Sequence, residues 1–193
     1  METLRVVQGE VNELIRMVDD LILLVRTDSK QLQFEMREIS LSDLLRSVGE
    51  RFQERAKTKE IVFSVTLQDA VKVKGDPVYL KRVFNNLLDN AMKFTPEKGE
   101  VSLVLEALNN QGRVIVRDNG MGIEPEKQSK VFSRFYRTES ARSHEGAGLG
   151  LNIAKAICDA HGAQMLLESG PGAGTQVVVL LPLFSQPQYL SLL

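Results

Sequence analysis

The sequence has little of several features that mark other classes of protein. It contains one cysteine, Cys158, in 193 residues, so no disulfide can form within the chain and a reducing compartment is expected. No stretch approaches the roughly 18 consecutive apolar residues of a membrane-spanning helix, and the first residues lack the basic-then-apolar order of a signal peptide. The chain is therefore expected to be soluble and cytoplasmic, with any membrane segment lying outside this sequence.

An excess of either charge is also missing. The 24 Lys and Arg residues nearly balance the 25 Asp and Glu residues, which leaves a formal net charge of -1. Overall electrostatics therefore give no reason to expect nucleic acid or an anionic membrane as a partner, and any bound anion must be held by local groups. The hydrophobic share of 43% is sufficient for a buried core.

The first 25 residues carry an apolar heptad pattern, widened by Ile15 and Ile22. Its core positions are Leu4, Val7, Val11, Leu14, Val18, Leu21 and Val25. This spacing predicts a long helix of a helical bundle, and pairing with a second chain would cover the stripe. The alternative, a helix that packs on its own globular domain, stays open at this point.

The remainder predicts a single α+β domain after a connector. Ser42 and Asp43 can cap a helix that runs to about Lys57, and Pro77 is placed to open another. Strand-like runs and one further helix follow, which indicates an α/β sandwich with helices on one face of a mixed, mainly antiparallel sheet. The expected divisions are residues 1–30 (bundle helix), 31–40 (linker), 41–184 (globular domain) and 185–193 (tail).

Three clusters carry residues suited to chemistry, and the first is NNLLDNAMKF. Asn86, Asn90 and Lys93 share one helix face, where asparagines in an apolar helix are costly unless they find partners. An amide oxygen of Asn90 suits Mg²⁺, and Lys93 can meet phosphate charge. Taken alone, a solvated polar stripe explains the pattern equally well.

The second cluster, RDNGMGIEP, follows a strand. Asp118 ends that strand, and Gly120 and Gly122 permit close backbone approach. An ionised carboxylate only accepts hydrogen bonds, which suits an exocyclic amine such as that of adenine. An ordinary turn is the alternative for this piece.

The third cluster, GAGLGLNIAKAI, places glycines directly before a helix. Free backbone N–H groups and the helix dipole favour an anion there, although a glycine hinge would look similar. The segment matches neither the P-loop pattern nor the dinucleotide-binding fingerprint.

Together the clusters resemble the ATP-binding domain of sensor histidine kinases, which is shared with gyrase, the heat-shock chaperone and mismatch-repair ATPases. NNLLDNAMKF is similar to the family's asparagine box, DNGMGI to its first glycine box, VFSRFYR to its phenylalanine box and GAGLGL to its second glycine box. GPGAGTQVVVLLP resembles its closing strand, and LIRMVDDLILLVRTDSKQL resembles the second helix of its dimerisation and phosphotransfer domain.

The resemblance implies ATP and Mg²⁺ as ligands, with Asn90 on the metal and Phe94, Asp118 and Thr175 beside adenine. It implies catalytic roles for Lys93, Arg134 and Arg137, and it places the two arginines together with the stretch 138–146 in a mobile lid over the triphosphate. The remaining nucleotide contacts that it implies are Asn86, Gly120, Gly122, Ile123, Gly146, Gly148, Leu149 and Gly150.

The family's phosphoacceptor histidine is not found in its usual motif. His144 lies in the lid sequence ARSHEGAGLG, and His161 ends a helix where a structural role is expected. The sequence is therefore expected to start after the acceptor helix and to bind nucleotide without phosphorylating itself.

The function implied is that of a protein-histidine kinase of a two-component system. Its expected partners are a second copy, paired through the N-terminal helix, and the receiver domain of a response regulator. Two alternatives stay open: a nucleotide-sensing or scaffolding module without chemistry, and a protein-serine kinase of the same fold.

Overall fold

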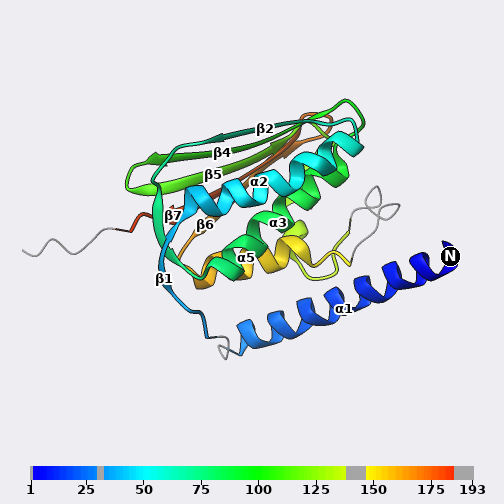
Figure 1. The fold of residues 1–193 in the computed structure, drawn as a ribbon, viewed down its shortest axis with the longest axis horizontal. Helices are drawn as coiled ribbons and strands as arrows, with labels where there is room; N and C mark the ends of the chain where they lie inside the picture. Colours follow the sequence, from blue (N-terminus) through cyan, green and yellow to red (C-terminus); the bar gives the residue numbers. More distant parts are fainter. Residues whose placement is uncertain (1, 30–32, 138–146, 185–193) are drawn as a thin grey trace, which may run out of the picture.

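The computed structural model describes residues 2–29, 33–137 and 147–184, which form one long helix followed by an α/β domain (Figure 1). In chain order the elements are α1 (Glu2–Asp28), β1 (Arg37–Ser40), α2 (Leu41–Thr58), β2 (Val62–Leu67), β3 (Lys72–Gly75), α3 (Pro77–Phe94), β4 (Glu100–Leu108), β5 (Gln111–Asp118), α4 (Pro125–Gln128), the short 3-10 helix η1 (Lys130–Phe132), α5 (Gly150–Ala160), β6 (Gln164–Gly170) and β7 (Gly174–Pro182).

The main sheet has the strand order β2-β4-β5-β7-β6. Only β2 and β4 pair in parallel, and the other pairs are antiparallel. Figure 1 shows α2, α3 and α5 together on one side of this sheet. The prediction of an α+β sandwich with a mixed, mainly antiparallel sheet is therefore confirmed. It follows from the alternating apolar residues of β4 and β5, which send every second side chain toward the helices.

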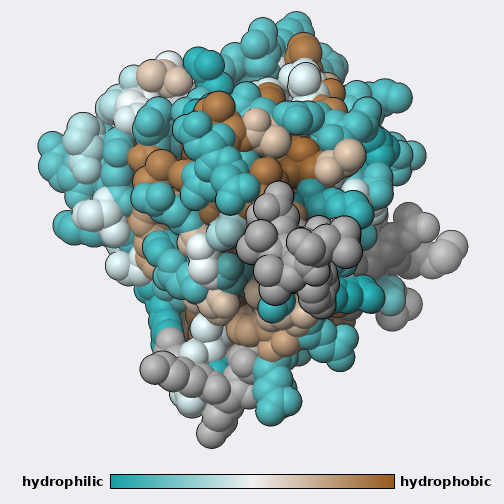
Figure 2. Space-filling view, turned by 90° about the vertical axis from the view of Figure 1, so that its left-hand side faces the viewer, coloured by the Kyte–Doolittle hydropathy of each residue, from teal (hydrophilic) through white to brown (hydrophobic). Residues whose placement is uncertain are grey.

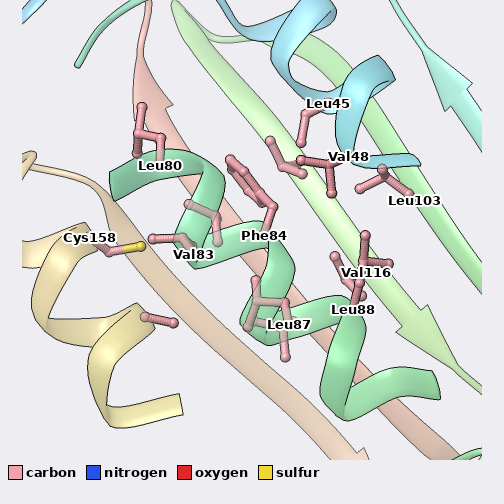
Figure 3. Close-up of a cluster of buried hydrophobic side chains, with 14 of the residues drawn as sticks. Leu45, Val48, Leu80, Val83, Phe84, Leu87, Leu88, Leu103, Val116 and Cys158 are labelled. Atoms are coloured by element: carbon pink, nitrogen blue, oxygen red, sulfur yellow. The ribbon is translucent and has the colours of Figure 1, made fainter. Parts of the chain in front are cut away.

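The core lies between the sheet and the three helices. Phe84 and Leu88 of α3 are fully buried among side chains of α2 and the sheet, and Cys158 of α5 points toward α3 (Figure 3). Burial raises the pKa of the Cys158 thiol to about 12, so this cysteine is a small core residue rather than a reactive thiol. At the end of the domain shown in Figure 2, hydrophilic residues form most of the surface around a few apolar ones.

Helix α1 carries two apolar faces rather than one. The predicted stripe is exposed at Val11, Leu14 and Val18, each about half accessible. Leu23 and Leu24 were not part of the predicted stripe, yet both are buried, and Leu21 packs against the same core. An ion pair between Asp20 and Arg82 of α3 adds to this docking, so the helix packs on its own domain and still leaves an apolar stripe uncovered.

The connector after α1 packs against the start of α3 and the end of α5. The Phe34 ring meets the rings of Tyr79 and His161 edge-on, each at 4.9 Å between centroids. The Glu35 N–H donates to Asp76 Oδ2 at 2.9 Å. The last part of the expected linker is strand β1, which pairs antiparallel with β3 in a small second sheet that the sequence did not reveal.

Helix α2 begins earlier than predicted. Its N-cap is Ser40, whose hydroxyl accepts from the Asp43 N–H at 3.2 Å. Ser42 was expected to cap, but its hydroxyl is buried, donates to Gln68 O and accepts from the Val71 N–H. The prediction was wrong because Ser42 fastens a neighbouring loop, and that contact depends on residues more than 25 positions away.

Candidate functional site

The polar face of α3 meets the start of α5. The Asn86 amide nitrogen donates to Gly150 O at 3.1 Å. A side chain at Gly150 would lie within 4 Å of both Asn86 and Asn90, so the two asparagines converge on the first turn of α5. Lys93 continues this face, and its Nζ lies 5.1 Å from the centre of the Phe94 ring. A basic, amide-rich surface therefore borders the positive end of a helix dipole.

Asp118 lies at the other end of the site, where it is only 8% exposed. Its Oδ1 accepts from the Gly120 N–H at 2.9 Å and from the Thr175 N–H at 3.2 Å. Burial raises the pKa of this carboxyl, and the two backbone donors oppose that shift in part. Both donors use Oδ1, which leaves Oδ2 as the oxygen that a ligand can use.

The loop after β5 lies against the end of α3 and the β6–β7 hairpin. A side chain at Gly120 would overlap the carbonyl group of Phe94, and one at Gly122 would overlap that of Gly170. Gly122 also has a φ of +69°, in the left-handed region that favours glycine. These two glycines allow the close packing that brings Asp118, Phe94 and Ile123 to one end of the site.

The second glycine segment leads into α5 beside the phenylalanine-box residues. Arg137 lies next to Gly148, where an added Cβ would come within 3.0 Å of the Arg137 Cγ. Leu149 is buried, so only its backbone can face a ligand. Arg134 is exposed. Gly146, His144 and the predicted lid at 138–146 lie outside the described residues.

His161 has a structural role, as expected. It is 6% exposed, and its Nε2 accepts from the Asp76 N–H at 3.0 Å. Its Nδ1 lies 2.8 Å from Ile157 O, which can only accept, so Nδ1 carries the proton. Burial lowers the pKa of this imidazole and favours the neutral form. Both ring nitrogens are engaged, which leaves no nitrogen lone pair to receive a phosphoryl group.

Sequence reasoning missed three polar residues that build the site's walls. Asn152 of α5 donates from its amide nitrogen to Phe132 O at 2.6 Å and anchors the phenylalanine-box segment. Gln128 and Ser169 tie the loop after β5 to the β6–β7 hairpin. Ser169 precedes a glycine-rich turn, but nothing in its local pattern separates it from an ordinary strand-end serine.

Among the described residues, no three His, Cys, Asp or Glu side chains gather at metal-binding spacing. A metal held mainly by ligand phosphates and water needs few protein oxygens, and the Asn90 amide is suited to supply one. In the same part of the chain, no helix has the length and apolarity needed to cross a bilayer.

Residues 75–185 match the family described as histidine kinase-, DNA gyrase B- and HSP90-like ATPases, and this covers more than half of the chain. The chain belongs to this family. A solved catalytic domain of the histidine kinase ThkA is 31% identical with a TM-score of 0.68, and the alignment covers 77% of this chain and 95% of that one. The α/β domain is accordingly a histidine-kinase catalytic ATPase domain.

Longer relatives match the N-terminal helix as well. The signal transduction histidine-protein kinase BaeS of Escherichia coli is 33% identical over 94% of this chain and 39% of its own length. The sensor histidine kinase WalK of Bacillus subtilis is 36% identical over 93% of this chain and 30% of its own length. Full-length ShkA, crystallised with AMPPNP, has a TM-score of 0.84 and 25% identity over 96% of this chain and 39% of that chain. The kinase-domain chain thus spans less than half the length of these relatives.

Proposed function

We propose that this chain binds ATP with Mg²⁺ and transfers the γ-phosphoryl group to a histidine on a separate helix. The observation that supports this best is the convergence of α3 and α5, where Asn86 and Asn90 meet Gly150 at a helix N-terminus. Asp118 and Thr175 form the opposite end, where the Thr175 N–H donates to Asp118 Oδ1 at 3.2 Å. The two ends suit a ligand that is anionic at one end and carries an amine at the other.

In this proposal the chain's groups position and neutralise the ligand rather than react with it. Asn90 holds Mg²⁺, which supplies charge neutralisation at the phosphates when it is bound. Lys93, Arg134 and Arg137 stabilise the negative charge that develops as the acceptor nitrogen bonds to phosphorus and the bond to the ADP oxygen breaks. Phe94 packs on the base, and the backbone around Gly148 and Gly150 holds the phosphates.

The proposed partners follow from α1 and from the relatives. The exposed stripe with Val11, Leu14 and Val18 is suited to another bundle helix, as in a homodimer. The two curated relatives BaeS and WalK are named as signal-transduction and sensor histidine kinases, which favours histidine over serine as the acceptor and a response regulator as the next recipient. A cytoplasmic location belongs to the same proposal.

Substitution of Asn90 tests the metal assignment. Asn90→Ala is expected to weaken ATP binding in Mg²⁺ by about tenfold and binding in EDTA much less, because it removes a metal ligand rather than a base contact. Titration of a fluorescent ATP analogue with and without Mg²⁺ measures both affinities. Asp89→Ala is the matched control, since Asp89 is the preceding residue of α3 and pairs with Arg55 instead. Equal losses with and without Mg²⁺ for Asn90→Ala would contradict the assignment.

Substitution of Asp118 tests the base assignment. Asp118→Asn is expected to weaken ATP binding by about 10- to 100-fold, the size of a hydrogen bond to a charged group, and to reduce the preference for ATP over GTP. The amide can donate as well as accept, so it tolerates the 6-oxo group of guanine. Competition calorimetry gives both affinities, with Asp159→Asn as an exposed carboxylate control. An unchanged preference would rule out contact between Asp118 and the base.

A further inference from the structure

The Ser169 hydroxyl lies where three strands of the site meet. Asp118 of β5 stands opposite Thr175 of β7, and Thr175 stands opposite Ser169 of β6. Cross-strand neighbours share a face of a sheet, and Asp118 belongs to the alternate residues of β5 that face the helices. The three side chains therefore form one row on the helix-covered face, at the end of the site proposed for the base.

The three partners of the Ser169 hydroxyl determine which group donates in each hydrogen bond. Its Oγ lies 2.8 Å from Gly174 O, 2.8 Å from the Ile123 nitrogen and 2.9 Å from Thr175 Oγ1. A hydroxyl donates one proton and accepts through two lone pairs. Gly174 O can only accept, so it receives the Ser169 proton, and the Ile123 N–H takes one lone pair. The Thr175 hydroxyl must then donate its own proton to the remaining lone pair.

Gln128 fixes this arrangement in place. Its amide nitrogen donates to Ile123 O at 3.1 Å and to Ser169 O at 2.7 Å. The loop after β5 and the end of β6 are thus joined by both a side chain and a backbone contact. This contact keeps the Ile123 N–H beside the Ser169 hydroxyl. One lone pair of Ser169 therefore stays occupied by Ile123, and the other is left for Thr175.

We infer that Ser169 is a positioning residue that makes Thr175 a hydrogen-bond acceptor toward the nucleotide base and so favours adenine over guanine. With its proton committed to Ser169, Thr175 Oγ1 can only accept, as does the Asp118 carboxylate in its ionised form. The 6-amino group of adenine offers two N–H donors, whereas the 6-oxo group of guanine offers none. This inference rests on the proposed function, because it assumes that the base lies beside Asp118 and Thr175.

The test compares ATP and GTP dissociation constants for the full chain by calorimetry. In Ser169→Ala the Thr175 hydroxyl is free to turn and donate to a 6-oxo group. The ratio of the GTP constant to the ATP constant is expected to fall by about three- to tenfold, the size of one neutral hydrogen bond. Ser169→Thr keeps a hydroxyl on the same atom and is expected to keep the ratio.

A double-mutant cycle separates this role from a general effect on structure. In Thr175→Val the hydroxyl is absent, so adding Ser169→Ala should cause no further fall in the ratio. An unchanged ratio in Ser169→Ala, or an equal fall in the Thr175→Val background, would overturn the inference.

If Ser169→Ala does not fold, Thr175→Val and Thr175→Ser test the same point, since only the valine should lower the ratio. Equal ratios in these two variants would also overturn the inference. An unsubstituted chain that binds neither nucleotide would instead refute the proposed function, so the two failures are distinguishable.

Discussion

Incubated with γ-labelled ATP, the chain alone is expected to gain no acid-labile phosphate, whereas an added helical hairpin with an exposed histidine should be labelled on that histidine. His161 is buried with both ring nitrogens hydrogen-bonded, and His144 stands in a glycine-rich sequence without the family's acceptor motif. Positioning of the acceptor supplies most of the rate in phosphoryl transfer, so labelling should be absent rather than modestly slower when no acceptor helix is docked.

The exposed stripe of α1 is the surface on which such a hairpin should dock. Leu14→Asp combined with Val18→Asp places two charges on this stripe, where both side chains are more than half exposed. Labelling of the hairpin should then fall by about tenfold or more, because the charges must be desolvated on docking. Leu21 is left unchanged, since it packs against the domain core.

The control for the docking test is Glu54→Gln on α2, which changes one charge on a helix away from α1. Acid and base treatment of the labelled products identifies phosphohistidine. Strong acid-labile label on the chain alone would contradict the first expectation. Hairpin labelling that ignores the two aspartates would contradict the docking surface.

Gly122→Ala is expected to abolish measurable ATP binding, whereas Gly172→Ala should leave it within about twofold. Both glycines have positive φ values, +69° and +71°, so alanine costs each about 1–2 kcal/mol of backbone strain. An alanine Cβ at Gly172 meets nothing within 4 Å, but at Gly122 it overlaps the Gly170 carbonyl. The loop with Ile123 must then separate from β6, which breaks the hydrogen bond from the Ile123 N–H to Ser169 and shifts the glycine loop that follows Asp118.

Calorimetric titration with ATP and thermal unfolding of both variants measure this difference. The two unfolding curves control for strain, which the variants share. ATP binding that is equal in the two variants would show that the packing of the loop against β6 does not matter for the site.

The sequence predicted those parts of the site that lie in contiguous motifs. Asn86 and Asn90 share a face because helical spacing requires it, and Asp118 ends a strand whose alternation is plain. The sheet with its helical layer followed from the same periodicities. The roles of the site residues in binding stay predictions. The structure nevertheless brings Asn86, Asn90 and Gly150 together, and it places Asp118 beside Thr175.

The features that were missed depend on contacts between distant residues. Ser40 and Ser42 are equally good caps by type, and only the loop at Val71 decides that Ser42 is used elsewhere. Leu23 and Leu24 become buried because α5 and α3 lie beside α1, which no heptad count can reveal. Ser169 gains its role from Ile123, a residue 46 positions away.

Because Cys158 is buried, its thiol can report transient separation of α3 and α5. The thiol is the sole cysteine, fully enclosed between α5 and α3, and with a pKa of about 12 it is almost entirely un-ionised at neutral pH. A thiol-specific reagent can modify it only during moments when the two helices part. The rate of modification therefore measures how often the interface that bears Asn86 and Gly150 opens. Any ligand that bridges these two helices will lower this rate, so its binding can be followed without a dye or an engineered label.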